Sequence, residues 1–402
     1  MTIWARATGC MVRIGFGAST RRHGKTRRAT LLGLAGLLVA FAVVGCAEEL
    51  PADSPSDGPT AVPSAEGSVT PMGGFIATGS MKTRYYQSAA LLSNGRVLIA
   101  GGSTDITGLG DTSAELFDPA TGTFTQTGSM TVARMNQSAT RLLDGRVLIA
   151  GGSGDASAEL YDPASGTFRS IGPMTAIRSQ PTAVLLLDGR VLLVGGSADL
   201  TSVELYDPQT GKFTKTGSMT TARAGATATL LSDGRVLVAG GSGLASAEVY
   251  DPRTGAFTAT GPMAVGRSGH TATRLADGRV LIAGGRVIGL SSLDSAEIYD
   301  PKTYDPKTRT SGSFSPAGTM TTRRSSHTAT ALADGRVLLV GGAGSGASAE
   351  VYVPKTGQFI ATGSLVSEHS VQTATLLGDG RVLIAGGNGG YGGSAPAELY
   401  KP

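Results

Sequence analysis

The tract Asp188-Gly-Arg-Val-Leu-Leu-Val-Gly-Gly196, followed by Val203-Glu-Leu-Tyr206-Asp-Pro208, decides the fold. Asp-Gly favours a tight type I′ hairpin turn, because both central residues of that turn need positive φ. The apolar run after the turn and the Val-Glu-Leu-Tyr stretch are typical of β-strands. Asp-Pro then predicts the end of a strand, because proline cannot donate a hydrogen bond to a sheet.

This tract occurs seven times. The turn recurs at Asn94, Asp144, Asp188, Asp233, Asp277, Asp334 and Asp379. The third-strand glutamates are Glu115, Glu159, Glu204, Glu248, Glu297, Glu350 and Glu398. Each is followed two residues later by an aromatic residue, namely Phe117, Tyr161, Tyr206, Tyr250, Tyr299, Tyr352 or Tyr400. The fourth-strand Gly-x-Phe residues are Phe75, Phe124, Phe168, Phe213, Phe257, Phe314 and Phe359. Four short strands per repeat of about 45 residues predict an all-β fold, a seven-bladed β-propeller of four-stranded antiparallel blades.

The order of the copies predicts how the ring closes. The first landmark is the fourth-strand Phe75 and the last is the third-strand Tyr400, so neither end holds a complete blade. We expect residues around Phe75 to supply the outer strand of the C-terminal blade, whose other strands lie in 372–402, because such closure leaves few exposed edges. The tandem Tyr-Asp-Pro-Lys-Thr at Tyr299 and Tyr304 is interpreted as a loop insertion rather than an extra strand.

The N-terminal segment has the composition of a signal peptide followed by a lipid-attachment site. A basic cluster precedes an uncharged run of 15 residues, and Val43-Val44-Gly45-Cys46 resembles the lipobox of bacterial lipoproteins. We predict a signal peptide over 1–45, lipid attachment at Cys46 and a disordered tether over 46–72, which would anchor the protein outside the cytoplasm, at the cell surface or in the periplasm. An ordinary signal peptide with an incidental cysteine is the alternative.

Charge argues against nucleic-acid binding. The chain has 34 Lys and Arg and 30 Asp and Glu, but seven of the basic residues and none of the acidic ones lie in 1–45. The remainder therefore carries 27 basic against 30 acidic residues, and the basic character belongs to the targeting segment.

The repeat landmarks resemble the kelch motif, and Arg-x-x-x-x-Ala-Thr…Asp-Gly-Arg-Val…Gly-Gly resembles the propeller domain of galactose oxidase. The resemblance covers 73–402 and implies this fold, with Phe in place of the kelch Trp. Tyr86, in Arg84-Tyr-Tyr86-Gln-Ser, stands where that enzyme has a copper-ligand tyrosine. The enzyme's cross-linking cysteine and additional domains have no counterpart here, so we infer the fold without the oxidase chemistry and expect no metal or other cofactor.

One arginine recurs before the first strand of six blades, with His369 in the seventh place. Six guanidinium groups around one channel mouth would bind carboxylate or phosphate, whereas in the alternative each pairs with the glutamate of its own blade. Tyr85 and Tyr391 would add an aromatic patch on the same face. The arginines are Arg84, Arg134, Arg178, Arg223, Arg267 and Arg324.

At the position three residues after this arginine, the residue type differs between blades. It holds Gln87, Gln137, Pro181, Ala226, His270, His327 and Gln372. His270 and His327, with Glu368, His369 and Tyr86, would be catalytic or metal-binding candidates if they converged at the mouth. In the alternative, the histidines form local hydrogen bonds.

These patterns favour a membrane-anchored, non-catalytic binding or scaffolding module for a protein segment or glycan. The alternative is a carbohydrate-active enzyme, an oxidase or isomerase relative with its site at the channel mouth. A third interpretation is a structural spacer without a selective ligand.

Overall fold

The computed structural model describes residues 73–402 except 105–107, 153, 197–199, 290, 306–309, 390–392 and 395, and also the short strands of 3–14. The chain divides into two compact units, 1–66 and 67–402. In the first unit, β1 (Ile3–Ala7) and β2 (Cys10–Ile14) pair as an antiparallel hairpin. The predicted lipid site at Cys46 and the tether lie outside the described residues. No helix that could cross a membrane occurs in the described part of the chain.

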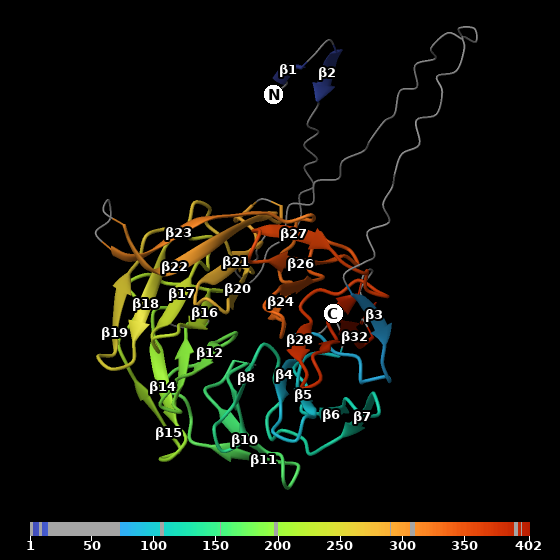
Figure 1. Ribbon diagram of the computed structural model, residues 1–402, viewed down its shortest axis with the longest axis vertical. Helices are drawn as coiled ribbons and strands as arrows, with labels where there is room; N and C mark the ends of the chain where they lie inside the picture. Colours follow the sequence, from blue (N-terminus) through green and yellow to red (C-terminus); the bar gives the residue numbers. More distant parts are fainter. Residues whose placement is uncertain are drawn as a thin grey trace, which may run out of the picture. The chain divides into compact units, whose positions relative to one another are not determined.

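The second unit is a ring of seven four-stranded antiparallel blades (Figure 1), which confirms the predicted fold. The inner strands neighbour one another round the central channel. They are β4 (Ser88–Leu91), β8 (Ser138–Arg141), β12 (Thr182–Leu185), β16 (Thr227–Leu230), β20 (Thr271–Arg274), β24 (Thr328–Ala331) and β28 (Thr373–Leu376). We number blades 1 to 7 in this order.

Three further strands complete each blade. The second strands are β5 (Val97–Ala100), β9 (Val147–Ala150), β13 (Val191–Val194), β17 (Val236–Ala239), β21 (Val280–Ala283), β25 (Val337–Val340) and β29 (Val382–Ala385). The third strands are β6 (Ala114–Asp118), β10 (Ala158–Asp162), β14 (Val203–Asp207), β18 (Ala247–Asp251), β22 (Ser295–Asp305), β26 (Ala349–Val353) and β32 (Glu398–Lys401). The outer strands are β7 (Thr123–Gln126), β11 (Thr167–Ile171), β15 (Lys212–Lys215), β19 (Ala256–Ala259), β23 (Thr310–Thr319), β27 (Gln358–Ala361) and β3 (Gly74–Ala77). In the loop after β29, β30 (Asn388–Gly389) pairs with β31 (Gly393–Ser394).

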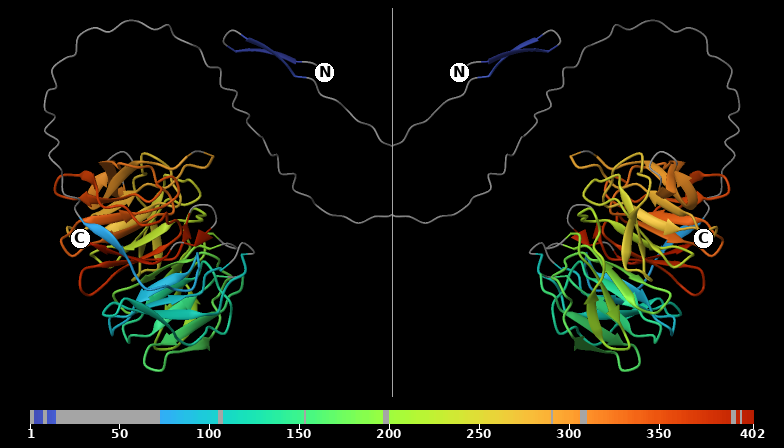
Figure 2. Two further views of the ribbon diagram at one scale, coloured as in Figure 1. Left: turned by 90° about the vertical axis from the view of Figure 1, so that its right-hand side faces the viewer. Right: turned by 90° about the vertical axis from the view of Figure 1, so that its left-hand side faces the viewer.

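Blade 7 closes the ring as predicted. Its strand order is β28-β29-β32-β3, and Phe75 lies opposite Tyr400 with ring centroids 5.0 Å apart. Figure 2 (left) shows the blue β3 beside the C-terminus. Blade 7 also shares a buried cluster with blade 1, in which Leu383 and Leu399 pack with Val97 and Phe117. The two ends of the propeller are therefore joined both by strand pairing and by an apolar core.

The core lies between neighbouring blades. The second strands, such as Val97–Ala100, are buried on both faces, which accounts for their uninterrupted apolar sequence. In each blade the third-strand aromatic ring packs on the fourth-strand phenylalanine, with centroids 4.8 to 5.0 Å apart. The Phe that replaces the kelch Trp thus fills a cross-strand position in every blade.

The Tyr-Asp-Pro-Lys-Thr duplication lengthens a hairpin instead of forming a loop insertion. It adds no strand, but Tyr304 pairs with Ser311 and Asp305 with Thr310, which extends β22 and β23. The ladder is irregular between Asp300 and Tyr304, a stretch that contains Pro301. Because proline cannot donate to the ladder, the pairing breaks there and resumes beyond it.

Candidate functional site

The six repeat arginines are buried inside their blades, so the expectation of an open arginine ring at the mouth is wrong. Each pairs with the third-strand glutamate of its own blade, with N–O distances of 2.5 to 3.2 Å. Arg134 is typical: its guanidinium also donates to the carbonyl oxygens of Gly151 at 2.9 Å and Ser157 at 3.0 Å. Burial lowers the pKa of Arg84, Arg267 and Arg324 against the opposing effect of the partner carboxylates. The repeat arginines Arg84, Arg134, Arg178, Arg223, Arg267 and Arg324 are therefore structural.

His369 takes the arginine's place in blade 7. Its Nε2 lies 3.0 Å from Glu398 Oε1, and its Nδ1 lies 2.9 Å from the carbonyl oxygen of Gly386. With both ring nitrogens engaged and the side chain buried, His369 belongs to the internal pairing of its blade and not to a catalytic group at the mouth.

His270 and His327 join neighbouring blades. A 3.0 Å hydrogen bond links His270 Nε2 to Thr227 Oγ1 of blade 4, and another links His327 Nε2 to Thr271 Oγ1 of blade 5. The glutamines at the same position also join neighbouring blades. Their Nε2 atoms donate to the carbonyl oxygen of the last residue in the preceding blade's second strand, at 2.7 or 2.8 Å. These glutamines are Gln87, Gln137 and Gln372. Residues at the shared position thus form hydrogen bonds that join neighbouring blades.

Both histidines are neutral at pH 7, and this predicts a pH-dependent stability. Burial, with the charge of Arg267, lowers the pKa of His270 to about 3, and burial with the charge of Arg324 and of His270 lowers that of His327 well below its usual value. The unfolded chain, with histidine pKa near 6.5, then binds more protons than the folded chain between about pH 6.5 and pH 3, so stability falls as pH falls. H270Q and H327Q introduce the glutamine that other blades carry at this position. We expect each to reduce the slope of the free energy of unfolding against pH by about 1.4 kcal/mol per pH unit. Urea unfolding from pH 7 to pH 4.5 measures this slope. Equal slopes for wild type and H270Q would contradict the prediction.

The candidate catalytic residues do not converge. Glu368 is exposed, while His270, His327 and His369 make the separate buried contacts described above. Among the residues that the structure describes, no three His, Cys, Asp or Glu side chains are grouped to hold a metal ion. Of the predicted aromatic patch, Tyr85 packs edge-on against Tyr86 with centroids 5.4 Å apart, and Tyr391 lies outside the described residues. The residues present do not fit a copper site of the oxidase kind.

The loops before the inner strands form a cavity of about 630 Å³ at the channel mouth, and we call this cavity the mouth. One equivalent residue from each blade lines it with φ between 52° and 65°, a left-handed conformation that is uncommon outside glycine. These residues are Tyr86, Asn136, Gln180, Gly225, Gly269, Ser326 and Val371. Sequence reasoning missed the set, because its members share a conformation and not a residue type.

Backbone hydrogen bonds link six of these seven residues to their counterparts in neighbouring blades. The N–H of Asn136 donates to the Tyr86 carbonyl oxygen at 2.9 Å, and that of Gln180 donates to the Asn136 oxygen at 3.1 Å. On the other side of the ring, Ser326 donates to Gly269 at 2.8 Å and Val371 donates to Ser326 at 3.1 Å. The strained residues are thus held by their neighbours, which gives the mouth a fixed backbone rim.

The described lining of the mouth consists mainly of hydroxyl, amide and small side chains, with a single arginine, Arg286. No aspartate or glutamate lines it in the part of the chain that the structure describes. Arg286 follows the Gly-Gly of blade 5, where other blades carry Ser103, Ser153, Ser197, Ser242, Ala343 or Asn388. A comparison of this position across the repeats would have found it from sequence.

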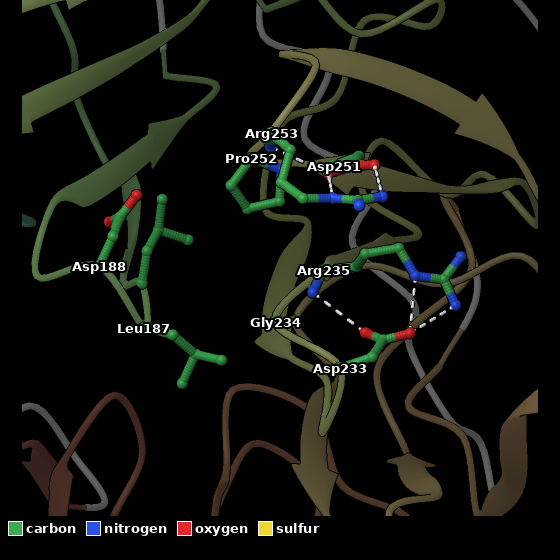
Figure 3. Close-up of a pocket in the computed structure, with 9 residues that line it drawn as sticks. Leu187, Asp188, Asp233, Gly234, Arg235, Asp251, Pro252 and Arg253 are labelled. Atoms are coloured by element: carbon green, nitrogen blue, oxygen red, sulfur yellow. Dashed lines mark hydrogen bonds and ion pairs between the residues drawn. The ribbon is translucent and has the colours of Figure 1, made fainter.

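The opposite end of the strands offers a contrast. In blades 2 to 7 the Asp-Gly-Arg arginine pairs with the aspartate of its own turn at 2.6 or 2.7 Å. A cavity of about 490 Å³ lies on this side. Figure 3 shows Arg235 paired with Asp233 and Arg253 paired with Asp251 in its lining. The basic groups of this pocket already have acidic partners, so the mouth is the better candidate for a charged or polar ligand.

Comparisons with known proteins agree with this architecture. A family model described as the Kelch motif matches residues 179–220. No curated protein matches the chain. A solved fungal alcohol oxidase of the AA5 family, in complex with copper, is 20% identical with a TM-score of 0.71, over 82% of this chain and 76% of that one. The chain therefore contains a kelch motif within a seven-bladed propeller that resembles the galactose oxidase type of fold.

Proposed function

We propose that this protein is an extracytoplasmic, lipid-anchored binding module that holds a glycan at the mouth of its propeller without acting on it. The observation that carries the proposal is the mouth itself, a cavity of about 630 Å³ whose polar lining stands on a hydrogen-bonded rim. Hydroxyl and amide groups match the hydroxyl groups of sugars, and a rigid rim lowers the ordering cost of binding.

Individual contacts support a glycan over a protein segment. Gln180 Nε2 donates to Asn136 Oδ1 at 3.1 Å, which orients two amides at the mouth. The Tyr86 ring supplies an aromatic face for stacking. The apolar lining is confined to small residues such as Pro181, Ala226 and Val371, and these offer little of the anchoring area that a peptide needs.

The AA5 neighbour raises a second candidate function, copper-dependent alcohol oxidation, because that protein is an alcohol oxidase in complex with copper. At 20% identity the likeness supports the fold alone. Tyr86 lies at the mouth, but His270 and His327 are engaged between blades and His369 with Glu398. We derive no catalytic step from this set.

A glycan array probed with the folded protein tests the proposal, with Y86N as the mouth variant. Asparagine occupies the same left-handed position in blade 2, so Y86N should fold. We expect a selective glycan signal that falls at least about tenfold in Y86N, because stacking on the tyrosine ring is lost. The control is L187S, which changes an exposed leucine near the opposite pocket to the serine of two other blades. Equal signals for Y86N and wild type, or selective capture of peptides only, would contradict the proposal.

The anchor is tested separately at Cys46. In a bacterial host we expect wild type in the membrane fraction, labelled by a radioactive fatty acid, and C46A unlabelled and free of the membrane, since stable anchoring needs the acyl chains. A wild-type protein that carries no label would favour the ordinary signal peptide instead.

A further inference from the structure

We infer that the glycan bound at the mouth carries a carboxylate group, as a uronic acid does, and that Arg286 of blade 5 binds it. This inference rests on the proposed function and adds the ligand's charge and the residue that recognises it.

Arg286 carries an uncompensated positive charge. Arg286 is exposed at the mouth, and it forms no ion pair or side-chain hydrogen bond with any residue that the structure describes. By contrast, the arginines that recur from blade to blade are paired, those before the inner strands with a buried glutamate and those of the turns with an aspartate. Since no carboxylate belongs to the mouth's lining among the residues that the structure describes, and His270 is neutral, the cavity favours a negative ligand.

The backbone presents this arginine rigidly. Arg286 and Ser268 exchange two backbone hydrogen bonds of 2.9 and 3.0 Å, and Arg286 also forms an antiparallel bridge with Ser292. The preceding Gly285 is required there, because a Cβ atom would lie 2.8 Å from the Ser268 carbonyl oxygen and 2.9 Å from His270 Cβ. A charged group on a fixed frame loses less freedom on binding than one on a mobile loop.

Groups that would complement a sugar acid lie around the mouth. Blades follow one another round the ring, so blade 5 lies across the mouth from blades 1 and 2, which carry Tyr86 and Asn136. Ser268 and Ser326 flank the arginine's side of the cavity. A guanidinium fork donates two parallel N–H groups to the two oxygens of a carboxylate, while hydroxyl and amide groups would take the sugar hydroxyls.

The test compares an acidic glycan with its neutral form. Isothermal titration of the folded protein uses oligogalacturonate and the same oligomer fully methyl-esterified, with R286S as the variant. Serine is the residue of four other blades at this position, so R286S should fold, and thermal unfolding checks it. The matched control is R274S, which removes an exposed charge from the same blade at the end of β20 next to the Asp-Gly-Arg turn.

We expect wild type and R274S to bind the acid at least about tenfold more tightly than the ester, and R286S to bind both equally, since one charge-assisted pair is lost. The wild-type preference should weaken between 0.05 and 0.5 M salt, because the Debye screening length shortens from about 14 Å to about 4 Å. Equal wild-type affinity for acid and ester would overturn this inference and leave the proposed function standing. Preference for a sulfated oligomer over the carboxylate would overturn the choice of anion. Failure to bind any glycan would overturn both.

Discussion

Replacing Glu159 with alanine should lower the free energy of unfolding by about 3 to 5 kcal/mol, the cost of leaving a buried charge without its partner. Glu159 is fully buried, and it accepts hydrogen bonds from the backbone N–H groups of Thr131 at 2.7 Å and Val132 at 3.2 Å as well as from Arg134. E159A therefore leaves a buried guanidinium without its carboxylate partner and two backbone N–H groups unsatisfied in one blade. Denaturant unfolding measures the loss.

The control for this prediction is R146A in the same blade, which breaks the partly exposed pair with Asp144. We expect a change below about 1 kcal/mol, because surface ion pairs contribute little. Comparable losses for E159A and R146A would contradict the distinction between the buried repeat pairs and the turn pairs.

The second large effect concerns ring closure. A chain that starts at residue 79 lacks β3, so β32 loses the pairing of Phe75 with Tyr400 and exposes a strand edge. We expect this chain to lose about 3 kcal/mol or more of stability, comparable to deleting one core aromatic side chain, and to aggregate. Thermal unfolding and light scattering measure both consequences.

A chain that starts at residue 73 retains β3 and serves as the control. It should unfold like the longer chain, and adding a peptide of residues 72–80 to the shorter chain should restore part of the stability by strand addition. If the chain without β3 unfolded like the control, closure by the N-terminal strand would not hold the ring.

The sequence predicted the blades and their closure because each strand carries its own local signal, repeated seven times. Turn residues, paired aromatic positions and the Gly-Gly landmark all act over a few residues. The duplicated Tyr-Asp-Pro-Lys-Thr was misread as a loop, because the resumption of pairing beyond Pro301 depends on partners such as Ser311 across the hairpin.

The site was less predictable, because its decisive contacts join distant residues. Arg134 and Glu159 recur with equal regularity, and the sequence left open whether they pair with each other or face a ligand. The hydrogen bond of His270 depends on Thr227 of another blade. Arg286 could have been found from sequence as a break in the repeat, whereas the left-handed rim from Tyr86 to Val371 follows from inter-blade hydrogen bonding.

The central claim is that the mouth, and no other face of the propeller, binds the ligand. Amide hydrogen exchange of the folded protein, with and without saturating oligogalacturonate, tests it most directly. We predict slower exchange in the segments 84–88, 268–271 and 324–328 on addition of ligand, with the Asp-Gly-Arg turns unchanged. Protection confined to those turns or to the outer strands, with bound ligand and an unchanged mouth, would contradict it.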